Sequence, residues 1–317
     1  MLEIPSILRA RRRRRRLSPF GRRTHVVGKV ASLVSGLLLL AGVLGAIGVY
    51  NSLWADLPSL EQLPVLLDYP QGQLLTPTTL YDRTGQQVIT VLEDPAARGR
   101  QYLPLDGDPS ASLPRVLVAA TLAAADPGFR EHNGYLLTDW EPDSHPTLAQ
   151  QLVYELLLSE EPASLRRSLR EHLLAGQATQ RFGQDQILEW YLNHARYGKL
   201  VYGADAAARV YFGKSASQLT LAEAAALVAL QQMPEVSPYQ APQLILEQKD
   251  RLLQTMLDNS WITASQKQQA ARQSLAFLPA EVSEAIAPAF VELVLEQLET
   301  VIPRQRLERG GFRILTT

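Results

Sequence analysis

The chain has 317 residues, of which 46% are apolar and none is cysteine. This length and apolar content suffice for one large or two modest hydrophobic cores. The absence of cysteine excludes disulfide bonds and thiolate chemistry. The five histidines show neither the HExxH spacing nor a comparable pattern of zinc ligands, so the residues themselves predict no metal site and no cofactor.

Charge is distributed unevenly along the chain, although the formal net charge is only −1. Residues 1–29 contain ten arginines and lysines against one glutamate, which leaves 21 basic and 31 acidic residues for the rest. No aromatic residues are interleaved with the arginines, so nucleic-acid binding is not predicted. We interpret residues 1–29 as a basic cytoplasmic arm that sets membrane topology or contacts lipid headgroups.

Residues 30–50 contain no charged side chain and are predicted to form a transmembrane helix. At 1.5 Å per residue, such a helix spans about 30 Å, the thickness of the hydrocarbon layer of a bilayer. A signal peptide is the alternative, but its apolar segment is usually shorter and ends at a small-residue cleavage site. Because the arginines stay on the cytoplasmic side, residues 51–317 are predicted to lie outside.

Residues 51–112 are predicted to form a stalk followed by a β-hairpin. Four prolines and little periodicity in residues 51–77 are typical of an irregular segment. The sequence TPTTLYDRTGQQVITVL, which follows, has alternating apolar positions on both sides of Asp82–Gly85. This pattern predicts two strands joined by a turn in which glycine supplies the positive φ.

Residues 113–302 are predicted to form a mainly helical domain. Thr220 with Glu223, and Thr263 with Gln266, have the spacing of capping boxes, and Asp185 is a candidate N-cap. The alanine-rich stretches 204–208 and 222–229 indicate closely packed core helices. Residues 303–317, with GGFRILTT, are predicted to form a strand that begins a connector. The remaining helices are expected at 114–124, 148–158, 165–182, 186–193, 264–275 and 288–302.

The segment from Ile187 to Tyr239 carries ordered motifs, beginning with Tyr191-Leu192-Asn193 and continuing through YFGK and TLAEAA. It resembles the last signature block of the peptidoglycan glycosyltransferase domain, glycosyltransferase family 51, of class A penicillin-binding proteins. The resemblance extends over roughly residues 78–317. It implies a lysozyme-like, mainly α fold that acts on lipid II, and a bacterial plasma-membrane location. A divalent cation such as magnesium is also compatible with the family.

The first family motif reads Glu-Asp-x-x-Phe-x-x-His-x-Gly, and the resemblance gives its glutamate the role of general base. Here Asp126, Phe129, His132 and Gly134 match, but Ala125 occupies the position of the glutamate. A methyl group cannot accept a proton, and loss of a positioned base reduces a rate by about 10²–10⁴. Asp126 is not expected to replace the missing glutamate as the base, because adjacent helical residues point about 100° apart.

The second and third motifs are also altered. In PTLAQQLVYE, Thr147, Gln150 and Gln151 match the family, whereas Tyr154 and Glu155 replace its lysine and asparagine. The third motif retains a second acid, Glu171, which is the candidate residual catalytic carboxylate. The resemblance assigns substrate binding to Phe129, His132, Thr147, Gln150, Gln151, Arg166, Arg167 and Arg170.

Several of these residues also have structural interpretations. For Phe129 we favour core packing under the cleft, and for His132 hydrogen bonding that holds the turn. Glu171 stands four residues after Arg167, the spacing of a helix ion pair. The three arginines are suited to a diphosphate, because a guanidinium matches phosphate oxygens.

These features predict a membrane-anchored protein of cell-wall assembly whose glycosyltransferase activity is weak or absent. It would bind lipid II or a nascent glycan strand, and a transpeptidase or an active synthase is a candidate partner. One alternative is an active, divergent polymerase that uses Glu171 or Glu131 as the base. Another is a structural stalk or scaffold for a penicillin-binding transpeptidase.

Overall fold

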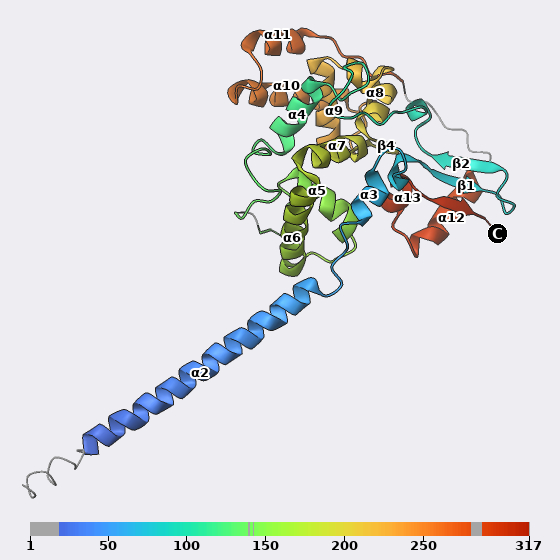
Figure 1. Cartoon of the computed structure of the whole chain (residues 1–317). Coiled ribbons are helices and arrows are strands. Elements are labelled where there is room, and N and C mark those ends of the chain that lie inside the picture. The colour runs from blue at the N-terminus through green and yellow to red at the C-terminus, as the bar shows by residue number, and fades with distance from the viewer. Residues whose placement is uncertain (1–18, 139, 142, 280–286, 317) are drawn as a thin grey trace, which may run out of the picture. The chain divides into compact units, whose positions relative to one another are not determined.

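The computed structural model describes residues 19–138, 140–141, 143–279 and 287–316. Its residues fall into two units that divide between Leu57 and Pro58. Most of the predicted basic arm, residues 1–18, lies outside the described residues. Figure 1 shows one long helix in the first unit and a helical body with a small sheet in the second. The predicted class, mainly α with a small β-hairpin and one preceding apolar helix, is confirmed.

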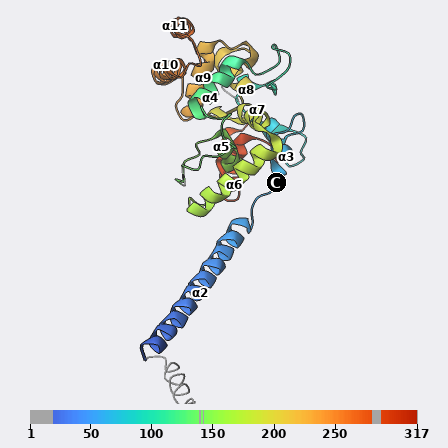
Figure 2. The ribbon, with the colours of Figure 1, turned by 60° about the vertical axis from the view of Figure 1, so that its left-hand side comes forward.

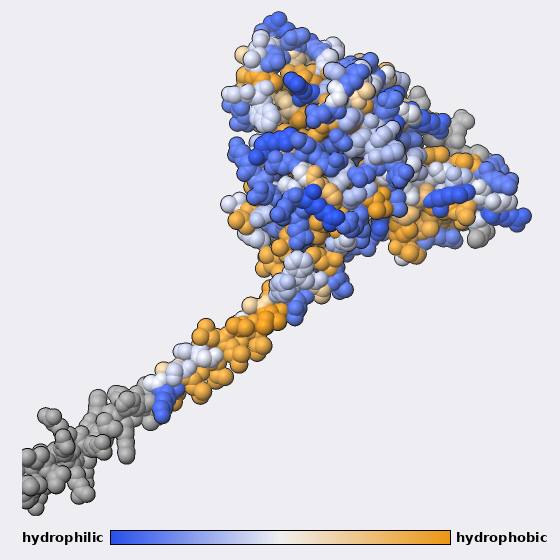
Figure 3. Space-filling model, viewed as in Figure 1, coloured by the Kyte–Doolittle hydropathy of each residue, from blue (hydrophilic) through white to orange (hydrophobic). Residues whose placement is uncertain are grey.

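In the described part of the first unit, helix α2 extends over Pro19–Trp54. Its segment Gly28–Trp54 has a mean hydropathy of 2.4, and none of it is buried within the protein. Figure 3 shows a hydrophobic surface along most of this segment. Its 27 residues correspond to about 40 Å of helix, so the predicted span at residues 30–50 fits within it.

The hairpin forms one sheet with the C-terminal strand. Strands β1 (Thr78–Tyr81) and β2 (Val88–Leu92) are antiparallel, as predicted. Strand β5 (Arg313–Leu315) pairs in parallel with β1, which gives the order β2-β1-β5. The predicted C-terminal strand therefore returns to the hairpin and completes its sheet.

Part of the predicted stalk is folded onto the second unit. It contains helix α3 (Gln62–Leu67) and the 3₁₀ turn Gln73–Leu75. Leu63 and Leu67 are fully or almost fully buried. Burial of leucine side chains outweighs the weak local helical signal, which is why sequence periodicity missed this element.

Among the described residues, the other regular elements of the second unit are helices and the two-stranded ribbon β3–β4. Helix α6 has the predicted bounds, and both predicted capping boxes are present. Helices α10 and α13 were not predicted. The bounds are α4 Arg115–Ala125, α5 Leu148–Val153, α6 Leu165–Phe182, α7 Gln184–His194, β3 Arg196–Gly198, β4 Val201–Tyr202, α8 Ala204–Phe212, α9 Leu221–Gln232, α10 Pro242–Asp258, α11 Ala264–Arg272, α12 Pro288–Glu299 and α13 Arg304–Arg309.

Two local details differ from the prediction. Gly183, and not Asp185, is the N-cap of α7, and Asp185 instead forms an exposed ion pair with Arg130. The segment predicted as one helix at 148–158 changes at Tyr154 into a π-helical turn, Tyr154–Leu158. Such turns are frequent at functional sites.

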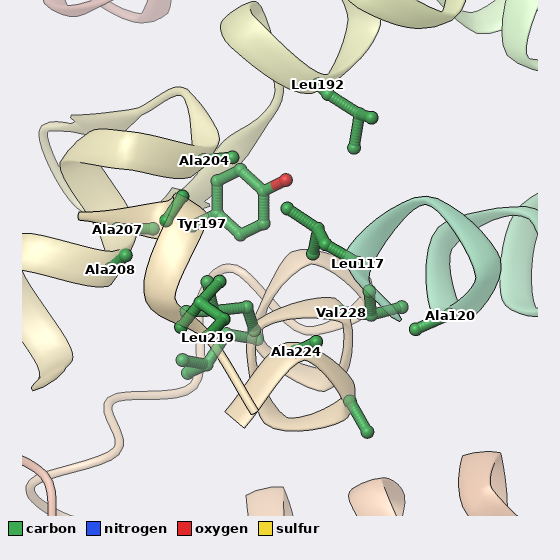
Figure 4. Close-up of a cluster of buried hydrophobic side chains, with 14 of the residues drawn as sticks. Leu117, Ala120, Leu192, Tyr197, Ala204, Ala207, Ala208, Leu219, Ala224 and Val228 are labelled. Carbon is green, nitrogen blue, oxygen red and sulfur yellow. The ribbon is translucent and has the colours of Figure 1, made fainter. Parts of the chain in front are cut away.

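The main core is built on alanine-rich helix α9, whose residues from Ala222 to Leu230 are all buried. Figure 2 shows α9 beside α4 and α10, which contact it and each other. Small side chains allow this close approach, and larger ones fill the remaining space. In Figure 4, Tyr197 and Leu117 lie among alanines and Val228. A smaller cluster joins β1, β2, α12 and α13 through Leu80, Leu92, Val291, Leu295 and Leu307.

Candidate functional site

Ala125, which the sequence resemblance places at the family's glutamate, lies at the end of α4. Ala125 is the last residue of this helix and lines a cleft of about 520 Å³. Gln151, Tyr191 and Gln231 line the same cleft. The side chain at position 125 therefore reaches the cleft, but its methyl group cannot take or give a proton.

The neighbouring acid, Asp126, is committed to hydrogen bonds that hold the fold. Its side chain is 3% exposed, and Nε2 of His132 lies 2.8 Å from Oδ1. Its Oδ2 accepts a hydrogen bond of 3.1 Å from the backbone N–H of Leu148, at the start of α5. The backbone N–H of Gly134 donates to Nδ1 of His132, so Nε2 carries the proton that His132 donates to Asp126. This pair fixes the turn between α4 and α5.

Phe129 is 2% exposed and lies in the main core, where its ring meets that of His132 edge to face. Thr147 donates a 2.7 Å hydrogen bond to the carbonyl of Gly134 and caps α5 by accepting from the backbone of Gln150. Phe129 therefore packs in the main core, and Thr147 stabilises the start of α5.

The second acid, Glu171, lies at the interface of α5 and α6 and is 1% exposed. The amide of Gln150 donates to Oε1 over 3.0 Å, and Nδ1 of His145 lies 2.8 Å from Oε2. An ionised carboxylate only accepts hydrogen bonds, so His145 is the donor. The alternative prediction of a helix ion pair with Arg167 is wrong, because Arg167 turns to Asp143 instead.

His145 belongs to an aromatic and cationic stack. Its ring stacks on Tyr154 with centroids 3.8 Å apart, and the guanidinium of Arg167 lies 5.0 Å from the centre of the Tyr154 ring. The sequence resemblance assigns Tyr154 to the position of the family motif's lysine. The stack thus places an aromatic ring where the motif has a flexible cation.

The arginines predicted to bind a diphosphate each face a carboxylate of this chain. Arg167, 4% exposed, pairs with Asp143 at 2.8 Å. Arg170, 1% exposed, pairs with Glu161, and Arg166 lies 3.7 Å from the same acid. Internal acids therefore compete with any phosphate for these guanidinium groups.

Gln151 connects the cleft to the segment that carries His145. The hydroxyl of Tyr191 donates to its Oε1 over 2.8 Å, and its Nε2 donates to the backbone carbonyl of His145 over 3.0 Å. Gln231 in turn donates to the oxygen of Tyr191. Burial raises the pKa of the Tyr191 phenol well above its ordinary value, so this residue remains a neutral donor.

Sequence reasoning missed Asp143, His145 and Glu161, because they belong to no family motif. Glu131, the other alternative base, is exposed. Among the described residues its side chain has no hydrogen-bond or ion-pair partner. It therefore takes no part in the hydrogen bonds that hold Asp126 and Glu171.

The donor set does not fit a preformed magnesium site. Mg²⁺ requires oxygen ligands in near-octahedral geometry. The oxygens of Glu171 accept from Gln150 and His145, and those of Asp126 from His132 and Leu148. Among the described residues, no group of three or more His, Cys, Asp or Glu side chains is arranged to hold a metal ion. We derive no catalytic step through a metal.

Comparison with known proteins shows what this arrangement resembles. Residues 145–257 match the family model described as Transglycosylase. This part of the chain is therefore similar to transglycosylases. It is similar to penicillin-binding protein 1A of Rickettsia prowazekii, with 28% identity over 280 residues that cover 83% of this chain and 34% of the relative. Penicillin-binding protein 1A of Aquifex aeolicus is 29% identical over 87% of this chain and 39% of the relative.

The corresponding protein of Escherichia coli is 29% identical over 87% of this chain and 32% of its own length. The chain thus spans about a third of these relatives. Among solved structures, penicillin-binding protein 1A from Haemophilus influenzae matches with 22% identity and a TM-score of 0.39, over 71% of this chain and 24% of that one. These matches show that residues 145–257 are similar to transglycosylases and that the chain is similar to part of penicillin-binding protein 1A. Its matched range begins after the motif that contains Ala125.

Proposed function

We propose that this protein is a membrane-anchored, catalytically impaired member of the peptidoglycan glycosyltransferase family that binds lipid II or a nascent glycan strand. In this proposal the second unit has the lysozyme-like fold of the family. The observation that supports the impairment is Ala125, which lines the cleft and which the sequence resemblance assigns to the position of the catalytic glutamate.

The proposed chemistry shows why that position matters. Glycan polymerisation joins the 4-hydroxyl of one sugar to the anomeric carbon of another and releases a lipid diphosphate. A base must take the hydroxyl proton, and cations must stabilise the departing diphosphate. Asp126 and Glu171 are committed to other side chains, and Arg167 and Arg170 face internal acids. The site therefore offers neither an available base for the hydroxyl proton nor available cations for the diphosphate.

The proposed location follows from charge and hydropathy. Helix α2 contains one apolar segment of 27 residues, preceded in sequence by the arginine-rich arm. In a bacterial plasma membrane, the positive-inside rule would keep the arm in the cytoplasm and put the transglycosylase domain outside. A lipid-linked substrate would then be presented at the same membrane surface.

The deciding experiment measures polymerisation of labelled lipid II by the full-length protein in proteoliposomes. We expect little activity from the wild type and a gain of about 10²-fold or more from Ala125→Glu, because a base is restored at the cleft. Ala125→Gln is the matched control, since it has similar size but no basic carboxylate. A wild type that polymerises lipid II and loses activity on Glu171→Gln would contradict the impairment. Failure of the wild type to bind both lipid II and a nascent glycan strand would contradict the proposed ligand.

A further inference from the structure

A second cavity, of about 820 Å³, lies between the outward face of α6 and the segment that follows Asn133. Neither Ala125 nor Glu171 lines it. Its described lining contains no Asp, Glu, Lys or Arg side chain. The lining residues are Asn133, Tyr135, Leu137, Trp140, Leu169, His172, Leu173, Gly176, Gln177, Thr179, Gln180 and Gln184.

Trp140 forms a flat aromatic wall that a buried histidine holds in place. Its ring stacks on His172 with centroids 4.4 Å apart and planes within 10°. His172 is 7% exposed, with Nδ1 2.7 Å from the carbonyl of Ser168 and Nε2 3.0 Å from that of Leu136. A neutral imidazole donates to one of these two carbonyls, which ties the ring to the backbone, and its face packs against Trp140. The indole itself is 39% exposed, which leaves aromatic surface for a ligand.

Tyr135 supplies a second ring, and a helical glycine makes its position possible. Gly176 lies in the interior of α6, where glycine is less favourable than alanine by about 1 kcal/mol. A Cβ at this position would lie 2.9 Å from Cε1 of Tyr135. Glycine therefore lets the tyrosine lie directly against the helix backbone, at the cavity wall.

Amide groups provide the polar part of the lining. The side chains of Asn133, Gln177 and Gln180 have no hydrogen-bond partner among the residues that the structure describes. Gln184 is fixed, because its Nε2 donates to the carbonyls of Phe129 and His132 over 2.8 and 2.9 Å. Each amide offers both a donor and an acceptor without net charge.

We propose that this cavity binds an N-acetylated sugar unit of a glycan strand, at a site separate from the Ala125 cleft. The apolar face of a pyranose ring would pack on Trp140, and its hydroxyl and acetamido groups would pair with the amides. The volume lies within the range of about 300–1,000 Å³ typical of ligand sites. The lack of charged residues in the described part of the lining disfavours a phosphate or a peptide carboxylate. The identity of the glycan as peptidoglycan rests on the proposed function.

The test is calorimetric titration of the full-length protein, in a zwitterionic detergent without a sugar headgroup, with triacetylchitotriose. We expect saturable binding that weakens at least tenfold in Trp140→Ala and in the surface variant Gln180→Ala. Trp261→Ala is the matched control, because this tryptophan is also partly exposed but lines a different cavity. It should bind like the wild type.

Gly176→Ala gives an independent test, since it should weaken binding by displacing Tyr135. The proposal is overturned if the wild type shows no saturable binding, or if Trp140→Ala binds as tightly as Trp261→Ala. Binding of dioleoylphosphatidylcholine vesicles that is lost in Trp140→Ala, without sugar binding, would assign the cavity to lipid instead. The probe has neither a diphosphate nor a lipid, so this result does not depend on whether Ala125→Glu restores polymerisation.

Discussion

Nδ1 of His145 lies 2.8 Å from Oε2 of Glu171, and this bond joins the segment before α5 to the buried face of α6. The other carboxylate oxygen accepts from Gln150. Both oxygens of the second acid in the site are therefore used to join two helices. This arrangement makes Glu171 a structural residue in the resting protein.

Glu171→Gln should lower the free energy of unfolding by about 1–3 kcal/mol. The new amide group can accept from only one of its two partners and faces the other with its NH₂ group. Thermal unfolding of the full-length protein in detergent would measure the change. Glu131→Gln, an exposed substitution, should stay within about 0.5 kcal/mol of the wild type. Equal shifts for the two variants would contradict the structural role of Glu171.

Asp126→Ala should destabilise the protein by about 3 kcal/mol. It leaves a buried N–H of Leu148 and Nε2–H of His132 without acceptors, and each such loss costs about 1–3 kcal/mol. Chemical denaturation monitored by circular dichroism would show the loss. The exposed acid Asp185 provides the control, since Asp185→Ala removes only a surface ion pair with Arg130. An Asp126→Ala protein as stable as this control would exclude the proposed link between α4 and α5.

Neutralising the internal acids should improve anion binding. The double variant Asp143→Asn, Glu161→Gln removes the carboxylates that pair with Arg167 and Arg170. We expect its affinity for inorganic pyrophosphate to rise roughly tenfold, because a phosphate oxygen then meets less competition for the guanidinium groups. Isothermal titration at two salt concentrations would measure this. Glu160→Gln is the control, since Glu160 pairs with the exposed Arg306. An unchanged affinity in the double variant would show that the arginines do not form an anion site.

Stability should fall as the pH drops below about 6.5, because of His194. Burial, followed by the charges of Arg309 and Arg100, lowers the pKa of His194 well below its ordinary value. The folded protein keeps this imidazole neutral while the unfolded chain takes up a proton, so His194 contributes up to about 1.4 kcal/mol of destabilisation per pH unit.

Burial raises the pKa of the neighbouring Glu155, which has the opposite effect on stability, but this side chain is 41% exposed and its effect is smaller. Melting temperatures between pH 7.5 and 5.5 would measure the net effect of His194 and Glu155 on stability. His194→Gln should flatten the pH dependence, and Glu155→Gln should retain it. The same slope in wild type and His194→Gln would rule out His194 as the source.

The sequence alone determined the features that depend on neighbouring residues. The apolar run at residues 30–50, the hairpin around Asp82–Gly85 and the capping boxes at Thr220 and Thr263 all follow from local composition and spacing. The substitution of the family's glutamate at position 125 is likewise a prediction from motif spacing. These signals are readable because their interactions join residues that are close in the chain.

Only the tertiary structure decided which side chains meet. Glu171 had a suitable helical partner in Arg167, yet it pairs with His145, which is 26 positions away. Strand β5 joins β1 across more than 230 positions, and α3 is held by burial of Leu63 and Leu67. Such contacts depend on how the whole chain packs, because a long-range partner gains its position from the fold and leaves no local pattern in the sequence.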